Sequence, residues 1–222
     1  MPRKKCELSN LISGKPESFY WLGFLLADGS FDKRGRIKIS LAIKDIGHLQ
    51  KLQTFLNVEN ISITENRFGN KYCNLQALDS KVSKVLIERY CISTDKTKNP
   101  PNLSQCNADE LFCISVGFID GDGHISNLKN RVDFQLQVKC HASWIENLKL
   151  MYPNANTRIN KSGYALSIIS NTEYLKDIKR RAQNLALPLM SRKWDVVDLN
   201  FESKYLIADK RKRKLNIFMT MG

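Results

Sequence analysis

Two short segments of this chain repeat one pattern, and the repetition constrains the fold more than any other sequence feature. Residues 20–31 read YWLGFLLADGSF, and residues 114–125 read ISVGFIDGDGHI. In both segments an apolar residue precedes Gly-Phe, an apolar residue follows, and Asp-Gly comes three residues later. The aspartates of the two Asp-Gly pairs, Asp28 and Asp122, are 94 positions apart. Such a duplication predicts two half-sites that meet on a pseudo-twofold axis.

The residues around each motif predict the same order of elements. An apolar helix ending in Asp-Gly is followed by a strand with period-two alternation, an amphipathic helix, further strands around 61–78 and 156–170, and a closing helix. Pro16 and Glu17 favour a helix start in the first copy, and Asn107-x-x-Glu110 is a capping pattern in the second. A hairpin turn is expected at Asn160–Gly163. The chain is therefore predicted to be an α+β protein with repeats at 1–101 and 110–222, a linker at 102–109 and a basic C-terminal tail.

Small residues recur on one face of each motif helix. Gly23 and Ala27 are four positions apart, as are Gly117 and Gly121, so each helix has a bare stripe that permits close backbone packing. We expect the two motif helices to pack on each other along these stripes. Gly29 and Gly123 are expected in the left-handed conformation that often ends a helix.

The motif acids occupy an electrostatically unfavourable place. A carboxylate in the last helical turn faces the negative end of the helix dipole, at a cost of about 0.3–1 kcal/mol. Parallel packing of two such helices brings Asp28 and Asp122 together, which adds repulsion. Converging carboxylates and free carbonyl groups are ligands for a hard divalent cation, and Mg²⁺ is the first candidate.

The charge of the chain points to a polyanionic partner. The chain carries 35 basic and 22 acidic residues, a net charge of +13, with +7 in residues 1–101 and +6 in residues 102–222. An even basic excess favours nucleic acid as the partner. No apolar run is long enough for a membrane span, the basic N-terminus lacks the apolar region of a secretory signal, and the six cysteines form no CxxC pair. We therefore expect an intracellular protein with reduced thiols and no membrane partner.

Two predicted strands present polar faces opposite their apolar faces. Arginine and glutamine are the side chains that read guanine and adenine edges in the major groove. Because the two polar faces differ in residue type, a DNA site that they read should be long and non-palindromic. The predicted DNA-binding residues are Arg36, Lys38, Ser40 and Lys44 in the first repeat, and Arg131, Asp133, Gln135, Gln137 and Lys139 in the second.

The segments WLGFLLADG and SVGFIDGDG resemble the paired motifs of LAGLIDADG homing endonucleases in their monomeric, two-repeat form. The resemblance covers nearly the whole chain, because the order of elements also matches. The first copy has Leu26 where the family often has an additional acid, whereas the second copy retains that acid as Asp120.

The resemblance implies two αββαββα repeats, each with a curved antiparallel sheet that lies in the DNA major groove. It also implies Mg²⁺-dependent hydrolysis of one phosphodiester per strand, with 3′ overhangs and with Mn²⁺ able to replace Mg²⁺. Asp28 and Asp122 would bind the metal, assisted by the carbonyl groups of Ala27 and Gly121. Double-stranded DNA is the implied partner, host intron RNA is a further one, and no obligate protein partner is expected.

The same resemblance implies a catalytic basic residue near the end of each repeat. Lys96 is the candidate in the first repeat, with Lys98 as the alternative, and Lys193 is the candidate in the second, with Arg192 beside it. Asp45 is a weaker candidate at the periphery of the site, where the family often has a polar residue, and its counterpart in the second repeat, Cys140, is not a convincing partner.

Two other functions on the same fold stay open at this point. One is an RNA-binding maturase that assists intron splicing, and the other is a DNA-binding regulator without catalytic activity. The presence of both motif acids and both lysines favours the nuclease over the regulator.

Overall fold

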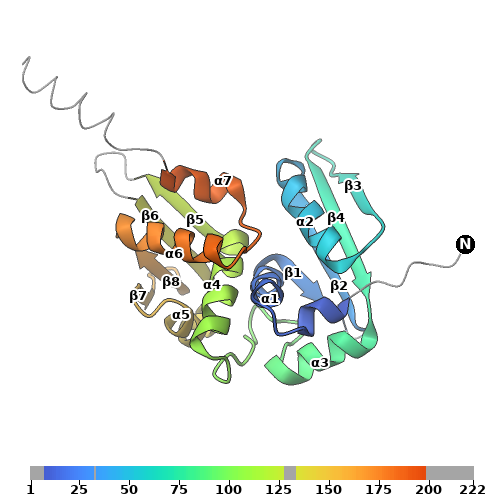
Figure 1. The fold of residues 1–222 in the computed structure, drawn as a ribbon, viewed down its shortest axis with the longest axis horizontal. Coiled ribbons are helices and arrows are strands. Elements are labelled where there is room, and N and C mark those ends of the chain that lie inside the picture. The colour runs from blue at the N-terminus through green and yellow to red at the C-terminus, as the bar shows by residue number, and fades with distance from the viewer. Residues whose placement is uncertain (1–7, 33, 128–133, 199–222) are drawn as a thin grey trace, which may run out of the picture.

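Two four-stranded antiparallel sheets flank a central pair of helices in the computed structural model (Figure 1). The structure describes residues 8–32, 34–127 and 134–198. The predicted DNA-binding residues Arg131 and Asp133 and the basic C-terminal tail lie outside these described residues.

The two repeats have the same order of elements, which confirms the predicted α+β class and the αββαββα plan. The first sheet has the strand order β1-β2-β4-β3, and the second has the equivalent order β5-β6-β8-β7. The first repeat contains α1 (Pro16–Asp28), β1 (Gly29–Phe31), β2 (Arg36–Ala42), α2 (Ile46–Leu56), β3 (Ile61–Glu65), β4 (Lys71–Leu78) and α3 (Ser80–Tyr90). The second contains α4 (Ala108–Asp122), β5 (Gly123–Asn127), β6 (Phe134–His141), α5 (Ile145–Met151), β7 (Asn156–Ile159), β8 (Tyr164–Ile169), α6 (Thr172–Asn184) and the short α7 (Ser191–Trp194).

Four 3-10 helices complete the described part of the chain. The 3-10 helix η1 (Leu8–Ile12) precedes α1, and η4 (Asp195–Asp198) follows α7. The other two, η2 (Ile43–Asp45) and η3 (Ala142–Trp144), occupy equivalent places in the two repeats, between the second strand and the following helix. Within the described ranges, no helix is both long and apolar enough to cross a membrane.

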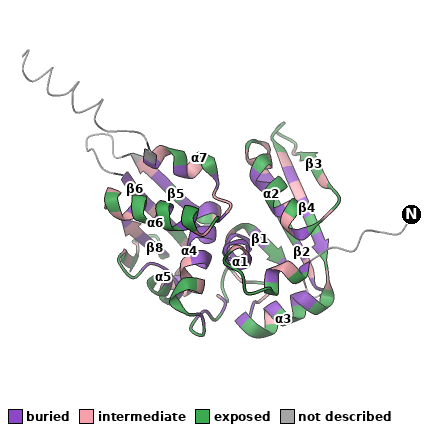
Figure 2. Cartoon of the chain, in the orientation of Figure 1, coloured by how far each residue is buried: buried purple, intermediate pink, exposed green. Residues whose placement is uncertain are grey.

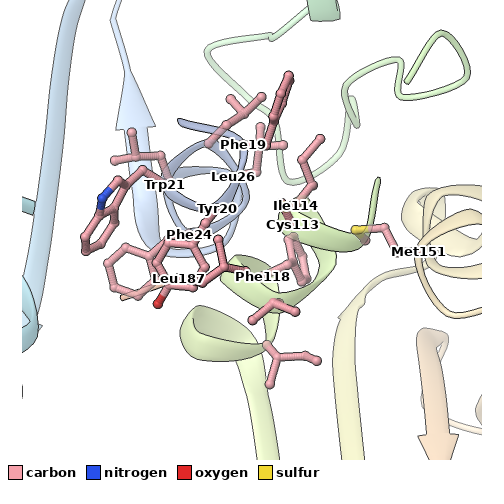
Figure 3. Packing of buried hydrophobic residues seen from close by; sticks show 14 of the residues in the cluster. Phe19, Tyr20, Trp21, Phe24, Leu26, Cys113, Ile114, Phe118, Met151 and Leu187 are labelled. Atoms are coloured by element: carbon pink, nitrogen blue, oxygen red, sulfur yellow. The ribbon is translucent and has the colours of Figure 1, made fainter. Parts of the chain in front are cut away.

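The motif helices α1 and α4 pack against each other through their glycines, as predicted. A Cβ atom added to Gly23 would lie 2.0 Å from the carbonyl oxygen of Ile114, and one added to Gly117 would lie 1.9 Å from that of Tyr20. Both distances are far below van der Waals contact, so only glycine permits this approach. Large apolar side chains, including the fully buried Phe24 and Phe118, surround the helix pair and form the core between the sheets (Figure 3).

Burial along the strands follows the predicted alternation (Figure 2). In β2, Ile37, Ile39 and Leu41 are buried while Lys38 and Ser40 are exposed. Lys44 does not lie on the strand as expected, because β2 ends at Ala42 and Lys44 lies in η2. Its contact with DNA stays a prediction. Ile43 and Lys44 continue the apolar–polar alternation of β2 in the sequence, so the pattern alone does not mark the end of the strand.

The starts of the two motif helices follow the sequence signals, whereas their ends differ from the prediction. Pro16 lies at the first position of α1, and Asn107 and Glu110 form a reciprocal capping box at α4. Gly29 and Gly123 have φ values of −80° and −79°, so they are extended and not left-handed. Each begins a strand directly, and an added Cβ atom would lie 2.6 Å from the carbonyl oxygen of Leu25 or Ile119, respectively.

The hairpin between the first two strands is five residues longer in the second repeat. Gly29 pairs with Ile39, ten positions on, while Gly123 pairs with Val138, fifteen positions on. Equivalent residues are therefore 94 positions apart in the motif helices and 99 apart after the hairpin. This shift overturns the pairing of Asp45 with Cys140: the structural equivalent of Asp45 is Trp144, and that of Cys140 is Leu41.

Candidate active site

The two motif acids end their helices at neighbouring points of the central interface. An added Cβ atom on Gly121 would lie 2.3 Å from the Cβ atom of Ala27 and 3.5 Å from the carboxyl carbon of Asp28. Asp28 and Asp122 each follow one member of this contact pair, and both side chains are exposed to solvent. The packing of α1 on α4 therefore places both carboxylates at one accessible location, as the duplication predicted.

The surroundings of these acids favour their neutral forms. Partial burial and the nearby charge of Asp122 raise the pKa of Asp28 to about 6, although Lys193 and Lys96 act in the opposite direction. Partial burial also raises the pKa of Asp122, and Lys96 and Lys193 again oppose this effect. A cation placed between the acids would relieve both costs, because it would stabilise the charged forms.

The two predicted lysines lie at the same location and occupy equivalent positions. The Lys96 ammonium group donates to the carbonyl oxygens of Leu26 and Ala27, at 2.6 and 2.8 Å. The Lys193 ammonium group donates to those of Ile119 and Gly121, at 2.9 and 2.6 Å. Each lysine thus binds main-chain carbonyl groups in the last turn of its own repeat's motif helix, and one of these oxygens, that of Ile119, also accepts from the Gly123 amide.

Each lysine is also electrostatically coupled to the acid of the opposite repeat. Among the basic groups that lower the pKa of Asp122, Lys96 has the larger effect, whereas Lys193 has the larger effect on Asp28. Burial lowers the pKa of both lysines, and the acids oppose that shift. The site is therefore a crossed arrangement of two acids and two lysines. Lys98, the alternative to Lys96, is exposed.

Each motif acid lines a hollow beside the polar face of its own sheet. A cavity of about 550 Å³ is lined by Asp122 and Lys96, together with Lys139 and Tyr164 from the second sheet. A second hollow, of about 240 Å³, places Asp28 beside residues of β2 and β4. The candidate active site is therefore continuous with the sheet surfaces that carry the predicted DNA-binding residues.

The predicted DNA-binding residues within the described strands occupy matched positions. Arg36, Lys38 and Ser40 in β2 are equivalent to Gln135, Gln137 and Lys139 in β6. These side chains are exposed or half-buried, while their strand neighbours are buried. The Lys139 ammonium group lies over the Tyr164 ring, 4.3 Å from its centroid. No matched pair is identical in residue type, so the two sheets present different polar surfaces.

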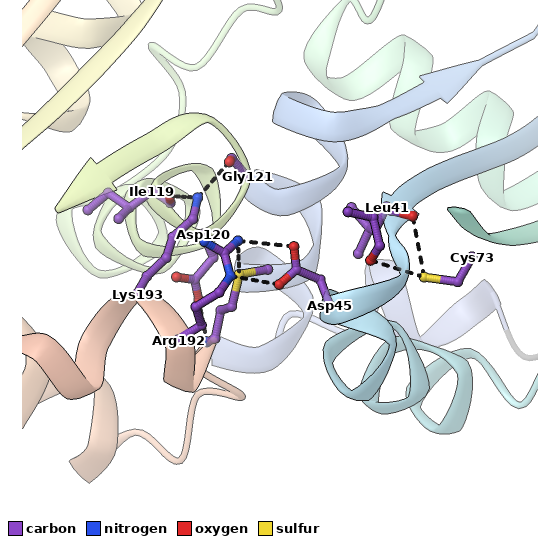
Figure 4. Close-up of polar contacts among 10 residues, drawn as sticks. Leu41, Asp45, Cys73, Ile119, Asp120, Gly121, Arg192 and Lys193 are labelled. Carbon is purple, nitrogen blue, oxygen red and sulfur yellow. Dashed lines mark hydrogen bonds and ion pairs between the residues drawn. The ribbon is translucent and has the colours of Figure 1, made fainter. Parts of the chain in front are cut away.

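Asp45 binds Arg192, the residue before Lys193, and does not bind either motif acid. Its carboxylate accepts two hydrogen bonds from the Arg192 guanidinium group, at 2.7 and 3.0 Å, and its side chain is only 10% exposed (Figure 4). The sequence placed Arg192 beside Lys193 but gave no sign of this pair, because the two partners are 147 positions apart.

Asp120, the additional acid of the second motif, is buried and accepts three hydrogen bonds. Its donors are the Tyr20 hydroxyl group at 2.5 Å, the Met190 amide at 2.8 Å and the Trp194 indole N–H at 2.7 Å. Met190 and Trp194 flank Arg192 and Lys193, so Asp120 fixes both ends of the segment that carries the second lysine. Leu26 occupies the equivalent place in the first repeat, where no carboxylate is available.

The donor set fits a hard divalent cation that keeps part of its hydration. Among the described residues, no cluster of three or more His, Cys, Asp or Glu side chains is present, so Asp28 and Asp122 would be the only charged ligands. The carbonyl oxygens of Ala27 and Gly121 accept hydrogen bonds from the lysines and each retain a second lone pair. Mg²⁺ commonly binds one or two carboxylates together with water and substrate phosphates, which matches this set.

The fold matches the two-repeat fold of LAGLIDADG homing endonucleases. The crystal structure of the LAGLIDADG homing endonuclease I-GzeII in complex with its DNA target is 15% identical, with a TM-score of 0.58, and the alignment covers 88% of this chain and 92% of that chain. I-LtrWI bound to target DNA is 16% identical, with a TM-score of 0.53 and coverage of 93% and 92%. I-SmaMI bound to uncleaved DNA in the presence of calcium ions is 14% identical, with a TM-score of 0.56 and coverage of 89% and 92%. No family model and no curated protein matches the sequence.

Proposed function

We propose that this chain is a site-specific DNA endonuclease of the LAGLIDADG homing endonuclease family. It would act as a monomer, hydrolysing one phosphodiester in each strand of a long, non-palindromic site and leaving 3′ overhangs. The observation that carries the proposal is the crossed set of Asp28, Asp122, Lys96 and Lys193, which opens onto two polar sheet surfaces. The similar folds of DNA-bound homing endonucleases support this reading.

The chemistry divides between the acids and the lysines. A divalent cation bound by Asp28 and Asp122, Mg²⁺ or in its place Mn²⁺, would supply a nucleophilic water and stabilise the leaving oxygen. The Lys96 and Lys193 ammonium groups are fixed by two carbonyl oxygens each, so they require little reorganisation as charge develops on the phosphate. Each ammonium group retains a third N–H that could donate to a phosphate oxygen or to water.

The sheet surfaces would supply sequence recognition. Lys38 and Ser40 in the first sheet and Gln135 and Gln137 in the second project from strands whose alternate residues are fixed in the core. Because matched positions differ in type, the half-sites that they read would also differ. Arg131, Asp133 and the basic tail stay predicted contacts.

The test is selection of cleaved sites from a randomised or genomic DNA library. We expect double-strand cleavage with Mg²⁺ or Mn²⁺, specific binding without cleavage in Ca²⁺, and no cleavage in EDTA. Asp28→Asn and Asp122→Asn should each abolish cleavage while preserving binding. Asp109→Asn is the matched control, because it removes an exposed carboxylate from the opposite end of α4. Undiminished cleavage in EDTA, or by either motif variant, would refute the proposed site.

A further inference from the structure

The site lysines lie in two short segments, residues 96–101 (the Lys96 segment) and residues 189–194 (the Lys193 segment). Each lysine segment is contacted by a side chain of the opposite repeat, and the two contacting side chains lie at equivalent positions but differ in type. Asp45 is the last residue of η2 and Trp144 is the last residue of η3. Asp45, in the first repeat, binds Arg192, which precedes Lys193 of the second. Trp144, in the second repeat, donates its indole N–H to the carbonyl oxygens of Lys96 and Thr97 of the first, at 3.0 and 3.1 Å.

Further hydrogen bonds follow the same crossed pattern. The Lys51 ammonium group of the first repeat donates to the carbonyl oxygen of Leu189 at 2.9 Å. The Asn147 amide of the second repeat donates to the carbonyl oxygen of Pro101 at 2.8 Å. Neither lysine segment is therefore held by its own repeat alone, because each contacts the 3-10 helix and the following α-helix of the opposite repeat, either η2 and α2 or η3 and α5.

The two contacts differ in chemistry, although their positions are equivalent. The Asp45–Arg192 contact is a charged, bidentate pair, while the Trp144 contact is neutral and its ring is almost fully buried, at 2% exposed. The Asp120 side chain adds a second constraint to the Lys193 segment, whereas the apolar side chain of the equivalent Leu26 has no group that could bind the Lys96 segment in the same way. The positions of the two lysines can thus be perturbed separately.

We infer that Asp45 and Trp144 are positioning residues, each of which sets the placement of the opposite repeat's lysine and thereby the cleavage rate of one DNA strand. This inference rests on the proposed endonuclease function. Loss of one contact should displace one ammonium group and leave the other in place. The result would be an enzyme that cuts one strand faster than the other.

Strand-resolved, single-turnover cleavage with Mg²⁺ tests the inference on a duplex target labelled differently on each strand. Lys96→Met and Lys193→Met first establish which strand each lysine serves. Trp144→Phe keeps an aromatic side chain of smaller volume and removes the indole N–H. It should slow cleavage of the DNA strand that Lys96 serves about 10- to 100-fold. Asp45→Asn should similarly slow cleavage of the DNA strand that Lys193 serves. Asp45→Glu, which keeps the charge, should cleave that strand faster than Asp45→Asn does.

Two matched controls separate positioning from general destabilisation. Trp21→Phe removes the indole N–H of another buried tryptophan, whose partner is Glu17 in its own helix. Asp95→Asn removes an exposed carboxylate next to Lys96. Neither control should change the ratio of the two strand rates. Equal slowing of both strands by Trp144→Phe and by Asp45→Asn would overturn the inference.

A second readout does not depend on cleavage. In the metal-free, DNA-free protein, the ammonium groups of Lys96 and Lys193 should give ¹H–¹⁵N signals slowed in exchange by their carbonyl partners, assigned with Lys→Arg variants. Trp144→Phe should shift or remove the Lys96 signal alone, and Asp45→Asn the Lys193 signal alone. Unchanged signals would refute the positioning role. If the parental protein cuts no DNA, the proposed function fails, while this spectrum still decides the positioning role.

Discussion

The Tyr20 hydroxyl group donates a 2.5 Å hydrogen bond to the Asp120 carboxylate and joins the two motif helices inside the core. Burial is the main cause of the raised pKa values of both groups, and the same hydroxyl also contacts the ring nitrogen Nε2 of His48, at 3.1 Å. Burial of that histidine lowers its pKa to about 3, so it is neutral in the folded protein. A hydrogen bond between a hydroxyl and a carboxyl group therefore links the two motif helices in addition to their apolar packing.

Tyr20→Phe should lower the free energy of unfolding by about 1–3 kcal/mol, because it removes one donor from a buried carboxylate. Urea denaturation at neutral pH measures the change. Tyr164→Phe is the control, since that side chain is 44% exposed, and its effect should stay within about 0.5 kcal/mol. Equal stability of the two variants would show that the buried bond contributes little.

Gly23→Ala and Gly117→Ala should each destabilise the protein by about 1–3 kcal/mol or more, since the new methyl group would overlap a main-chain carbonyl of the facing helix. Gly47→Ala in α2 is the matched control: an added Cβ atom there has no neighbour within 4 Å. That variant should gain up to about 1 kcal/mol from improved helix propensity. Thermal denaturation of the three variants distinguishes close packing from a general cost of replacing glycine.

Asp28→Asn should stabilise the metal-free protein at neutral pH. The folded-state pKa of about 6 lies above the ordinary value of 3.8, so parental stability should fall as the pH rises between these values and then level off. The asparagine variant lacks this titration, and its advantage should therefore be absent near pH 4 and complete above about pH 7. Denaturation in EDTA across this range checks the sign, and a variant less stable than the parent at pH 7.5 would contradict it.

Lys38→Ala should weaken DNA binding and reduce the slope of log affinity against log salt by about 1, because one phosphate or base contact is lost. Lys84→Ala is the control, as this lysine lies on α3 and its side chain is 74% exposed. The control should leave both the affinity and the slope unchanged. Equal losses in the two variants would indicate that charge alone, and not the β2 surface, governs binding.

The sequence predicted the features that depend on local pattern or on duplication. The motif helices, their glycine contact, the capping box at Asn107 and the turn at Asn160–Gly163 follow from residue type and spacing. Asp28 and Asp122 could be paired because nothing interrupts the correspondence within the motif. The proximity of Lys96 and Lys193 to these acids was reached through the family resemblance, since each is separated from its helix by about 70 residues.

Features that depend on long-range geometry were missed. The longer second hairpin changes the offset between repeats from 94 to 99. Asp45 was compared with Cys140, 95 positions on, whereas its structural equivalent, Trp144, lies 99 positions on. A search for the repeats on both sides of that hairpin separately would have found it. The extended conformation of Gly29 and Gly123 also escaped prediction, because a helix that passes directly into a strand leaves the same Asp-Gly signal as a left-handed helix end.

The direct passage from helix to strand at Gly29 and Gly123 has a mechanical consequence. With no intervening loop, the last helical residue and the first strand residue are consecutive, so no flexible segment separates either acid from its sheet. Any tilt that a sheet adopts on meeting a curved surface would be transmitted directly to the gap between Asp28 and Asp122. The spacing of the two carboxylates would then report how well the whole protein fits its target.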